Sequence, residues 1–302
     1  MMLPAIFGNF AIDDLVFPDG TTRWAVPGGS AAYAALGAAL WAGSASAVAP
    51  LGDDYPLALL SAIDTTRCRQ IPHTMRNWGL YEEDGSRCFV SRSRDRDWSL
   101  FCPSISDVHT GRQTAAHLAP MPFARASELI DELRRCEARI ISLDLDNHDV
   151  SEPVTRDEQL EQIRAVDLFL PSKQDMQRIF PGLPVALALR QLRECAPAVA
   201  LIAIKCGAAG VVAHIAGSQQ ILSLPSAARS VADTTGAGDA FCGAVLAGFA
   251  SHADPLQALL QGTIAAACCV EAFGLSGLRK VDRKTLEERL RLAQNHVESS
   301  LF

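Results

Sequence analysis

The segment VADTTGAGDAFCGAVLAGF, residues 231–249, carries the most information in this chain of 302 residues. Its Gly236-Ala237-Gly238 is a flexible turn of small residues, and the small and apolar residues that follow are typical of a buried helix. The first N–H groups of a helix lack partners within the helix and lie at the positive end of its dipole. The turn is therefore a candidate anion site suited to phosphate. Asp239 falls in the first helical turn, where its carboxylate can face the same anion.

A carboxylate at this position has two possible roles. It can accept the proton of a hydroxyl group that attacks a bound phosphate. Alternatively, Asp239 only caps the helix while Asp233 and Thr234 form the turn, which is the commoner situation for an isolated Asp-plus-Gly turn. Glycine at position 238 is expected to let the backbone approach a phosphate and to adopt a dihedral angle that valine disfavours.

Outward from this segment, short and continuous apolar runs alternate with helical patterns. Continuous runs are typical of strands that are covered on both faces, so the alternation predicts βαβ units around a mostly parallel sheet. The expected strands are 4–8, 46–51, 139–145, 166–170, 199–205 and 210–216. The expected helices are 30–42, 56–67, 124–135, 173–180, 184–195, 239–250, 255–272 and 283–299. We therefore expect a single domain, 1–302, with three α/β/α layers.

Two segments interrupt this alternation. Residues 13–27 contain an Asp-Gly turn between short β-prone pieces, and residues 73–103 contain Asp84-Gly85 between two runs that read as a hairpin. Both segments carry apolar and aromatic residues that need a surface to cover. We expect them to form a small β lid beside the main sheet, the alternative being ordinary surface loops.

Composition and charge exclude several classes of protein. The net charge is −7 with a pI near 5.5, so neither a nucleic-acid partner nor a basic membrane-binding face is expected. The nine cysteines form no C-x-x-C pair, which favours buried thiols in a reducing compartment over zinc. Residues 26–52 are uncharged and long enough to span a bilayer, but their small residues and Pro50 favour a buried helix followed by a strand. Without a cationic leader at its start, the chain is expected to be cytoplasmic.

The spaced pattern D-T-T-G-A-G-D-x-F-x-G, which begins at Asp233, closely resembles the C-terminal signature of the ribokinase-like (PfkB) carbohydrate kinases. Further landmarks follow the order of that family: Gly8–Asp13 (GNFAID), Gly28-Gly29, Gly52-Asp53-Asp54 and Lys205–Gly210 (KCGAAG). The resemblance implies a ribokinase-like fold with a lid. It also implies transfer of phosphate from ATP, with Mg²⁺, to a hydroxyl group of a small sugar or polyol.

The resemblance also assigns roles to residues. Asp239 would be the general base, with Gly236, Ala237 and Gly238 as the anion hole around the transferred phosphate. The acceptor would lie against Gly28, Gly29, Tyr33 and Asp13, the aspartate that ends the first strand of the sheet. The nucleotide would lie against Lys205, Gly207, Gly210 and Ser172. Asp175 would hold Mg²⁺ through water. Asp233 and Thr235 would lie beside a monovalent cation such as K⁺, with backbone carbonyls from residues 268–276.

The chain departs from the family pattern at three places. Ser172 and Asp175 stand where the family has asparagine and glutamate in its N-x-x-E motif. Tyr33 replaces the asparagine that follows the glycine pair. The D-P-N segment reads Asp144-Leu145-Asp146, and Asp146 could contact magnesium or the sugar, or be solvated.

Other functions fit the sequence less well. A dinucleotide-dependent oxidoreductase needs G-x-G-x-x-G after a strand, and a P-loop ATPase needs G-x-x-x-x-G-K-[ST]; the chain has neither. A non-catalytic sugar-binding relative would be expected to have lost the base or the glycine turn, and this chain keeps both.

Within the kinases, the acceptor stays open. The arginines that could clamp a phosphosugar, or lie on an exposed hairpin face, are Arg87, Arg92, Arg94 and Arg96. The aromatic residues that could stack on a nucleoside or pack the lid are Tyr33, Trp78, Trp98 and Phe101. The lid also offers a surface for a homodimer.

Overall fold

The computed structural model describes residues 3–83, 87–92, 98–109, 115–145, 154–252 and 254–302. A ten-stranded sheet runs through the molecule in the order β16-β15-β14-β13-β12-β11-β10-β1-β4-β6. Its strands are β1 (Ala5–Phe7), β4 (Ala45–Val48), β6 (Ile63–Asp64), β10 (Ala115–Leu118), β11 (Ile140–Leu143), β12 (Leu168–Phe169), β13 (Leu201–Lys205), β14 (Val211–Ile215), β15 (Gln220–Leu224) and β16 (Glu298–Leu301). The pairs from β6 to β13 are parallel, and β14 to β16 extend the sheet in antiparallel fashion.

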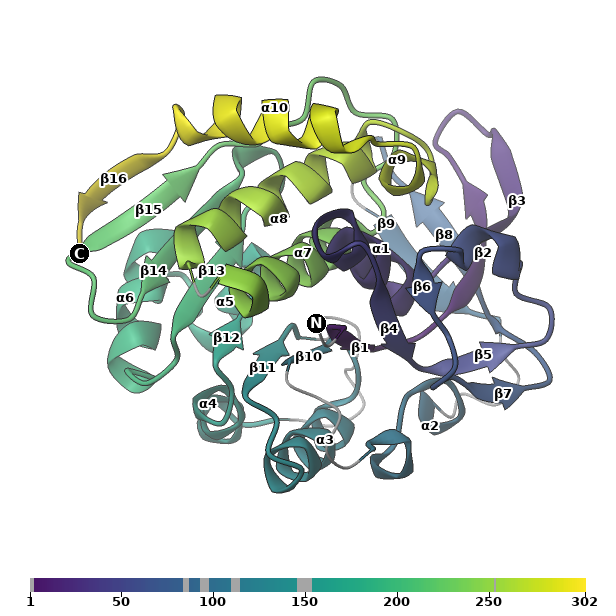
Figure 1. Cartoon of the computed structure of the whole chain (residues 1–302), viewed down its shortest axis with the longest axis horizontal. Helices are drawn as coiled ribbons and strands as arrows, with labels where there is room; N and C mark the ends of the chain where they lie inside the picture. The colour runs from purple at the N-terminus through teal and green to yellow at the C-terminus, as the bar shows by residue number, and fades with distance from the viewer. Residues whose placement is uncertain (1–2, 84–86, 93–97, 110–114, 146–153, 253) are drawn as a thin grey trace.

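Helices cover both faces of this sheet (Figure 1). On one face lie α1 (Ser30–Ala42), α7 (Ala237–His252), α8 (Pro255–Val270), α9 (Ser276–Arg279) and α10 (Arg283–Gln294). On the other face lie α3 (Phe123–Arg135), α4 (Arg156–Arg164), α5 (Lys173–Ile179) and α6 (Val185–Cys195). Each face has its own apolar core. The first core contains Phe241 and many alanines, and the second contains Phe169 and Leu129.

A second, four-stranded sheet lies beside the first, at the right of Figure 1. Its order is β3-β2-β8-β9, from β2 (Ala11–Val16), β3 (Thr22–Gly28), β8 (Met75–Tyr81) and β9 (Arg87–Ser91). We call it the lid sheet, because its strands come from the two segments expected to form a lid. The antiparallel pairing of β8 with β9 matches the expected hairpin, whose Asp84-Gly85 turn lies outside the described residues. A separate two-stranded sheet pairs β5 (Pro50–Gly52) with β7 (Arg69–Ile71). Helix α2 (Trp98–Phe101) follows β9.

The three-layer architecture is confirmed, with corrections in detail. The helix expected over residues 56–67 is wrong: the chain forms a 3-10 turn at Leu57–Leu60 and then strand β6. The reason is local, because the Asp64 carboxylate accepts hydrogen bonds from the N–H and hydroxyl of Thr66 and so closes a turn. The expected helix over 283–299 ends at Gln294, and Glu298 and Ser299 pair with β15 instead. The expected strand over 46–51 divides into β4 and β5.

Residues 26–52 fold as anticipated from their small residues, with α1 buried against α7 and followed by β4. Over the described ranges, no helix combines the length and apolarity that crossing a membrane requires.

Candidate active site

The candidate phosphate site lies at the N-terminus of α7, where Gly236-Ala237-Gly238 leads into the helix. Gly236 has φ +75°, and a β-carbon there would lie 2.1 Å from Cγ of Tyr33. The Tyr33 ring therefore lies flat against the Gly236 backbone. Gly238 has an ordinary φ, and its β-carbon would lie 3.6 Å from Lys205 Nζ. The conformational need for glycine is thus at Gly236, and the expectation of a dihedral that valine disfavours at Gly238 is wrong.

Asp239 is the third residue of α7 and is half-buried. Beneath it, the Lys205 ammonium forms an ion pair with Asp144 at the end of β11 and lies 3.4 Å from Sγ of Cys242, one turn further along α7. Burial by itself disfavours the ammonium, but the Asp144 carboxylate holds the pKa of Lys205 above its ordinary value. The Lys205 side chain, expected beside the nucleotide, therefore supports the first turn of α7 from below.

The predicted magnesium ligand lies beside this ion pair. Asp175 is buried, and its Oδ2 accepts hydrogen bonds from the N–H (2.7 Å) and hydroxyl (2.6 Å) of Ser172 at the start of α5. Its Oδ1 is buried and has no hydrogen-bond partner among the described residues. Burial, helped by the charge of Asp144, raises the pKa of Asp175 to about 6.

This donor set fits a hydrated Mg²⁺. Nowhere in the described chain do three His, Cys, Asp or Glu side chains gather closely enough to hold a metal directly. A single orphaned carboxylate oxygen is instead a good acceptor for a water ligand of Mg²⁺, an ion that keeps several of its waters when phosphates bind it. Asp146 lies outside the described residues.

On the acceptor side, Asp13 and Tyr33 lie together. Asp13 is not at the end of a central strand, as expected, but within β2 of the lid sheet, because Asn9 turns the chain there. The Asn9 amide oxygen accepts from the N–H and hydroxyl of Ser30. Asp13 is buried and accepts a hydrogen bond of 2.8 Å from Nδ2 of Asn77, its neighbour in β8. Burial raises the pKa of Asp13 to about 6, although the Asn77 hydrogen bond lowers it.

The glycine pair brings these groups close to the phosphate site. A β-carbon on Gly28 would lie 3.2 Å from Cε2 of Tyr33 and 3.7 Å from both the Tyr33 hydroxyl and Oδ2 of Asp13. The Tyr33 ring thus extends from Gly236 to Gly28, with its hydroxyl near Asp13. Gly29 has φ +99°, and a β-carbon there would lie 2.4 Å from the Asn9 carbonyl oxygen. Tyr55, which the sequence did not suggest, donates a hydrogen bond of 3.0 Å to the Gly28 carbonyl.

The remaining glycine landmarks differ in exposure. Gly207 is exposed with open space around it, so a ligand can approach its backbone. Gly210 is buried, and a β-carbon there would lie 2.0 Å from the Leu224 carbonyl oxygen, so this glycine lets the turn pack against β15. Asp54 of the Gly52-Asp53-Asp54 landmark binds Thr74 and Arg76 and fixes the entry into β8.

Asp233 has the surroundings of a cation site. It is 7% exposed, with Oδ1 accepting from the N–H of Thr235 (2.9 Å) and Oδ2 from the N–H of Gly274 (3.0 Å). Among the salt bridges of the described residues, none gives Asp233 a cationic partner. Since a buried carboxylate is costly without a counter-charge, this position fits a bound monovalent cation.

Lid residues reach this loop. The hydroxyls of Tyr81, at the end of β8, and Thr235 share a short hydrogen bond. The Phe17 ring lies 5.0 Å from the Tyr81 ring and 6.5 Å from that of Phe273, and the Arg23 guanidinium lies 4.4 Å above Phe273. The sequence did not identify these contacts, because they join residues that lie far apart along the chain.

Arg92, one of the candidate phosphate-binding arginines, is engaged elsewhere. It forms an ion pair with Asp14 and lies over the ring of Trp78. Successive strand residues point to opposite faces, so Asp14 and Trp78 lie on the other face of the lid sheet from Asp13 and Asn77. The described residues do not include Arg94 or Arg96, nor the side chains of Arg87 and Trp98.

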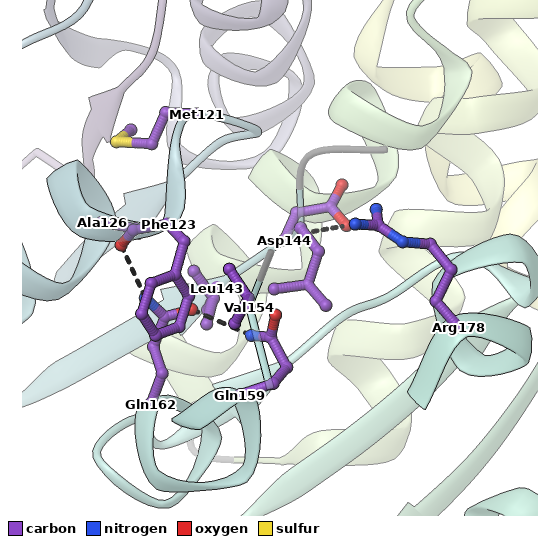
Figure 2. A pocket seen from close by; sticks show the side chains of 10 residues that line it. Met121, Phe123, Ala126, Leu143, Asp144, Val154, Gln159, Gln162 and Arg178 are labelled. Carbon is purple, nitrogen blue, oxygen red and sulfur yellow. Dashed lines mark hydrogen bonds between the residues drawn. The ribbon is translucent and has the colours of Figure 1, made fainter. Parts of the chain in front are cut away.

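A cavity at the end of β11 is too small for a sugar or nucleotide. Figure 2 shows Asp144 on one side of it, with Gln162 bonded to the Phe123 carbonyl (3.0 Å) and to Gln159 (3.0 Å) on the other. Its volume of about 30 Å³ has room for only about two water molecules.

Comparison with known proteins identifies the family of this chain. The model of the pfkB family carbohydrate kinases matches residues 14–280. The chain belongs to this family. The proteins it resembles include the cytidine kinase of Thermococcus kodakarensis, 28% identical over 258 residues that cover 83% of this chain and 90% of that protein.

Solved structures share the fold. The fructokinase of Vibrio cholerae O395, with fructose, ADP and calcium ion bound, has a TM-score of 0.75 at 20% identity and covers 96% of this chain and 99% of its own. The aminoimidazole riboside kinase of Salmonella enterica, complexed with aminoimidazole riboside and an ATP analogue, has a TM-score of 0.73 at 20% identity, covering 95% and 99%. This pfkB protein is thus a carbohydrate or nucleoside kinase.

Proposed function

We propose that this kinase transfers the γ-phosphate of ATP to a hydroxyl group of a small, unphosphorylated sugar or polyol. The observation that carries the proposal is the buried carboxylate of Asp13, held by Asn77 beside Tyr33, whose ring contacts the anion turn at Gly236. A carboxylate accepts hydrogen bonds from vicinal hydroxyls and repels a phosphate. Arg92, on the opposite face of the lid sheet, adds no positive charge on this side.

In the proposed mechanism, the acceptor oxygen attacks the γ-phosphorus while the bond to the β–γ bridging oxygen breaks and ADP leaves. Asp239 takes the proton of the attacking hydroxyl. The N–H groups at the start of α7, with Gly236 and Gly238, stabilise the charge on the transferring group. Mg²⁺, when bound with ATP, neutralises charge on the phosphate oxygens, and Asp175 would hold one of its waters. Lys205 and Asp144 keep the first turn of α7 in place.

A nucleoside is the second candidate acceptor. The 28% identity to a cytidine kinase over 83% of the chain favours it, and a ribose would also present vicinal hydroxyls to Asp13. A screen for ADP release with Mg²⁺ and K⁺, across pentoses, hexoses, polyols, nucleosides including cytidine, and phosphosugars, separates the candidates. Turnover only with phosphosugars would overturn the proposal.

Asp13→Ala is expected to raise the KM of the acceptor by at least about tenfold and to leave the KM of ATP nearly unchanged. Each lost charge-assisted hydrogen bond contributes about 1.5–3 kcal/mol. Arg92→Ala, directly after β9 of the same sheet, is the matched control, and we expect it to change the acceptor KM by less than about threefold. Steady-state kinetics with each substrate varied in turn measure both. Loss of the acceptor in Arg92→Ala with normal binding in Asp13→Ala would point to a phosphorylated substrate.

Acceptor binding is expected to weaken as the pH falls through about 6, the pKa to which burial raises Asp13. Above that pH the carboxylate is ionised and accepts hydrogen bonds, and one unit below it only about a tenth remains ionised. The kcat/KM of the acceptor, measured at saturating ATP and Mg²⁺, should therefore fall about tenfold for each unit below pH 6. Asp13→Asn should remove this limb of the profile, and an unchanged limb would assign it to another group.

A further inference from the structure

The segment that delivers the anion turn has little regular structure of its own. Residues 225–236, between β15 and α7, contain neither helix nor strand, and Val231 is 68% exposed. The Asp233 carboxylate and the Gly236 turn nevertheless need defined positions. Their placement must therefore come from hydrogen bonds to neighbouring elements.

Those bonds lead to one ion pair between α8 and α10. Arg289, 6% exposed in α10, donates to both carboxylate oxygens of Glu271, at 2.6 and 2.8 Å. The same guanidinium donates to the Ala227 carbonyl (3.0 Å), and Glu271 accepts from the N–H of Arg229 (2.7 Å). The two side chains thus hold the irregular segment from both its carbonyl and its N–H groups.

The adjacent backbone continues this attachment to the cation site. Val270, which precedes Glu271, accepts hydrogen bonds from the N–H groups of Ala232 (2.7 Å) and Asp233 (3.2 Å). Three residues beyond Glu271, the N–H of Gly274 binds Oδ2 of Asp233. The position of Glu271 therefore determines where both sides of the Asp233 site lie.

We infer that the Arg289–Glu271 pair positions the Asp233–Thr235 turn and so sets the affinity of the monovalent-cation site. The inference rests on the proposal that a monovalent cation binds at Asp233 in this kinase. A bidentate, buried guanidinium–carboxylate pair suits this task, because its two parallel hydrogen bonds fix direction as well as distance. The exposed Arg283–Glu287 pair on α10 has a single contact of 2.9 Å. It has no hydrogen bond to residues 225–236 or 271–274 among those of the described residues, so it provides a matched control.

The test is the increase in melting temperature that K⁺ gives over tetramethylammonium at equal ionic strength, titrated in wild type, Glu271→Gln and Arg289→Lys. We expect both variants to raise the half-saturating K⁺ concentration by about 2–30-fold. Arg283→Lys and Glu287→Gln should leave it unchanged. The melting temperature does not depend on turnover. A protein without kinase activity whose Glu271→Gln and Arg289→Lys variants still bind K⁺ more weakly would therefore contradict the proposed function and support the positioning role.

Three results would overturn the inference. The first is a wild-type protein with no K⁺-dependent stabilisation. The second is a fall in melting temperature that is equal in both salts while the half-saturating K⁺ concentration stays constant, which would make the pair merely structural. The third is tighter K⁺ binding in Arg289→Met together with weaker K⁺ binding in Glu271→Gln. Opposite changes in K⁺ affinity would mean that the two side chains act through their charges and not through the position of the turn.

Discussion

Asp239→Asn is expected to lower kcat by about 10²–10⁴ while ATP binding and stability change little. Asparagine has nearly the same shape and still suits the first turn of a helix, but it cannot take a proton from the acceptor hydroxyl. Because the side chain is half-buried at the start of α7, the substitution should not create a cavity. Single-turnover kinetics with bound ATP isolate the transfer step from product release.

Asp254→Asn is the matched control for the alternative that Asp239 only caps its helix. Asp254 caps α8 by accepting hydrogen bonds from the N–H groups of Leu256 (3.0 Å) and Gln257 (3.2 Å), and asparagine serves as well at such a position. We expect Asp254→Asn to leave kcat unchanged. Near-normal turnover in a folded Asp239→Asn protein would remove the proposed base from the mechanism.

Gly236→Ala is expected to abolish turnover and to destabilise the fold by about 2–5 kcal/mol. The left-handed φ of +75° costs an alanine about 1–2 kcal/mol. Overpacking adds about 1–3 kcal/mol, because the new β-carbon would lie 2.1 Å from Cγ of Tyr33 and must displace its ring. Chemical denaturation and an ADP-release assay measure the two effects separately.

Gly238→Ala separates steric cost from the presence of a side chain in this turn. Its β-carbon would lie 3.6 Å from Lys205 at an ordinary φ, so stability should stay within about 1 kcal/mol of wild type. Tyr33→Ala should destabilise the Gly236→Ala protein less than it destabilises wild type, since it removes the buried ring that the new β-carbon displaces but leaves the dihedral strain. Equal stability of Gly236→Ala and Gly238→Ala would contradict the placement of Tyr33.

Local pattern was enough to identify the layers of this fold. The continuous apolar runs predicted β1, β11 and β13, and the small-residue segment after Gly29 predicted α1 with the bounds observed. The spaced signature from Asp233 to Gly243 predicted the family, because its small and acidic residues all fall within one turn and the start of one helix. Such features are encoded by residues close in sequence. The helix expected over 56–67 failed because a short-range Asp64–Thr66 turn competes with helical periodicity.

Only the tertiary structure decided which of these residues meet. It moved Asp13 from the central sheet to the lid sheet beside Asn77, and it placed the Tyr33 ring against Gly236 and the Lys205 side chain against Gly238. It also joined Arg289 to Glu271 beneath the cation loop. Such contacts depend on how parallel strands order themselves and on how helices pack across them, and no local pattern records either. The sequence by itself therefore determined the chemistry available to this protein, whereas packing between distant segments decided which groups share the site.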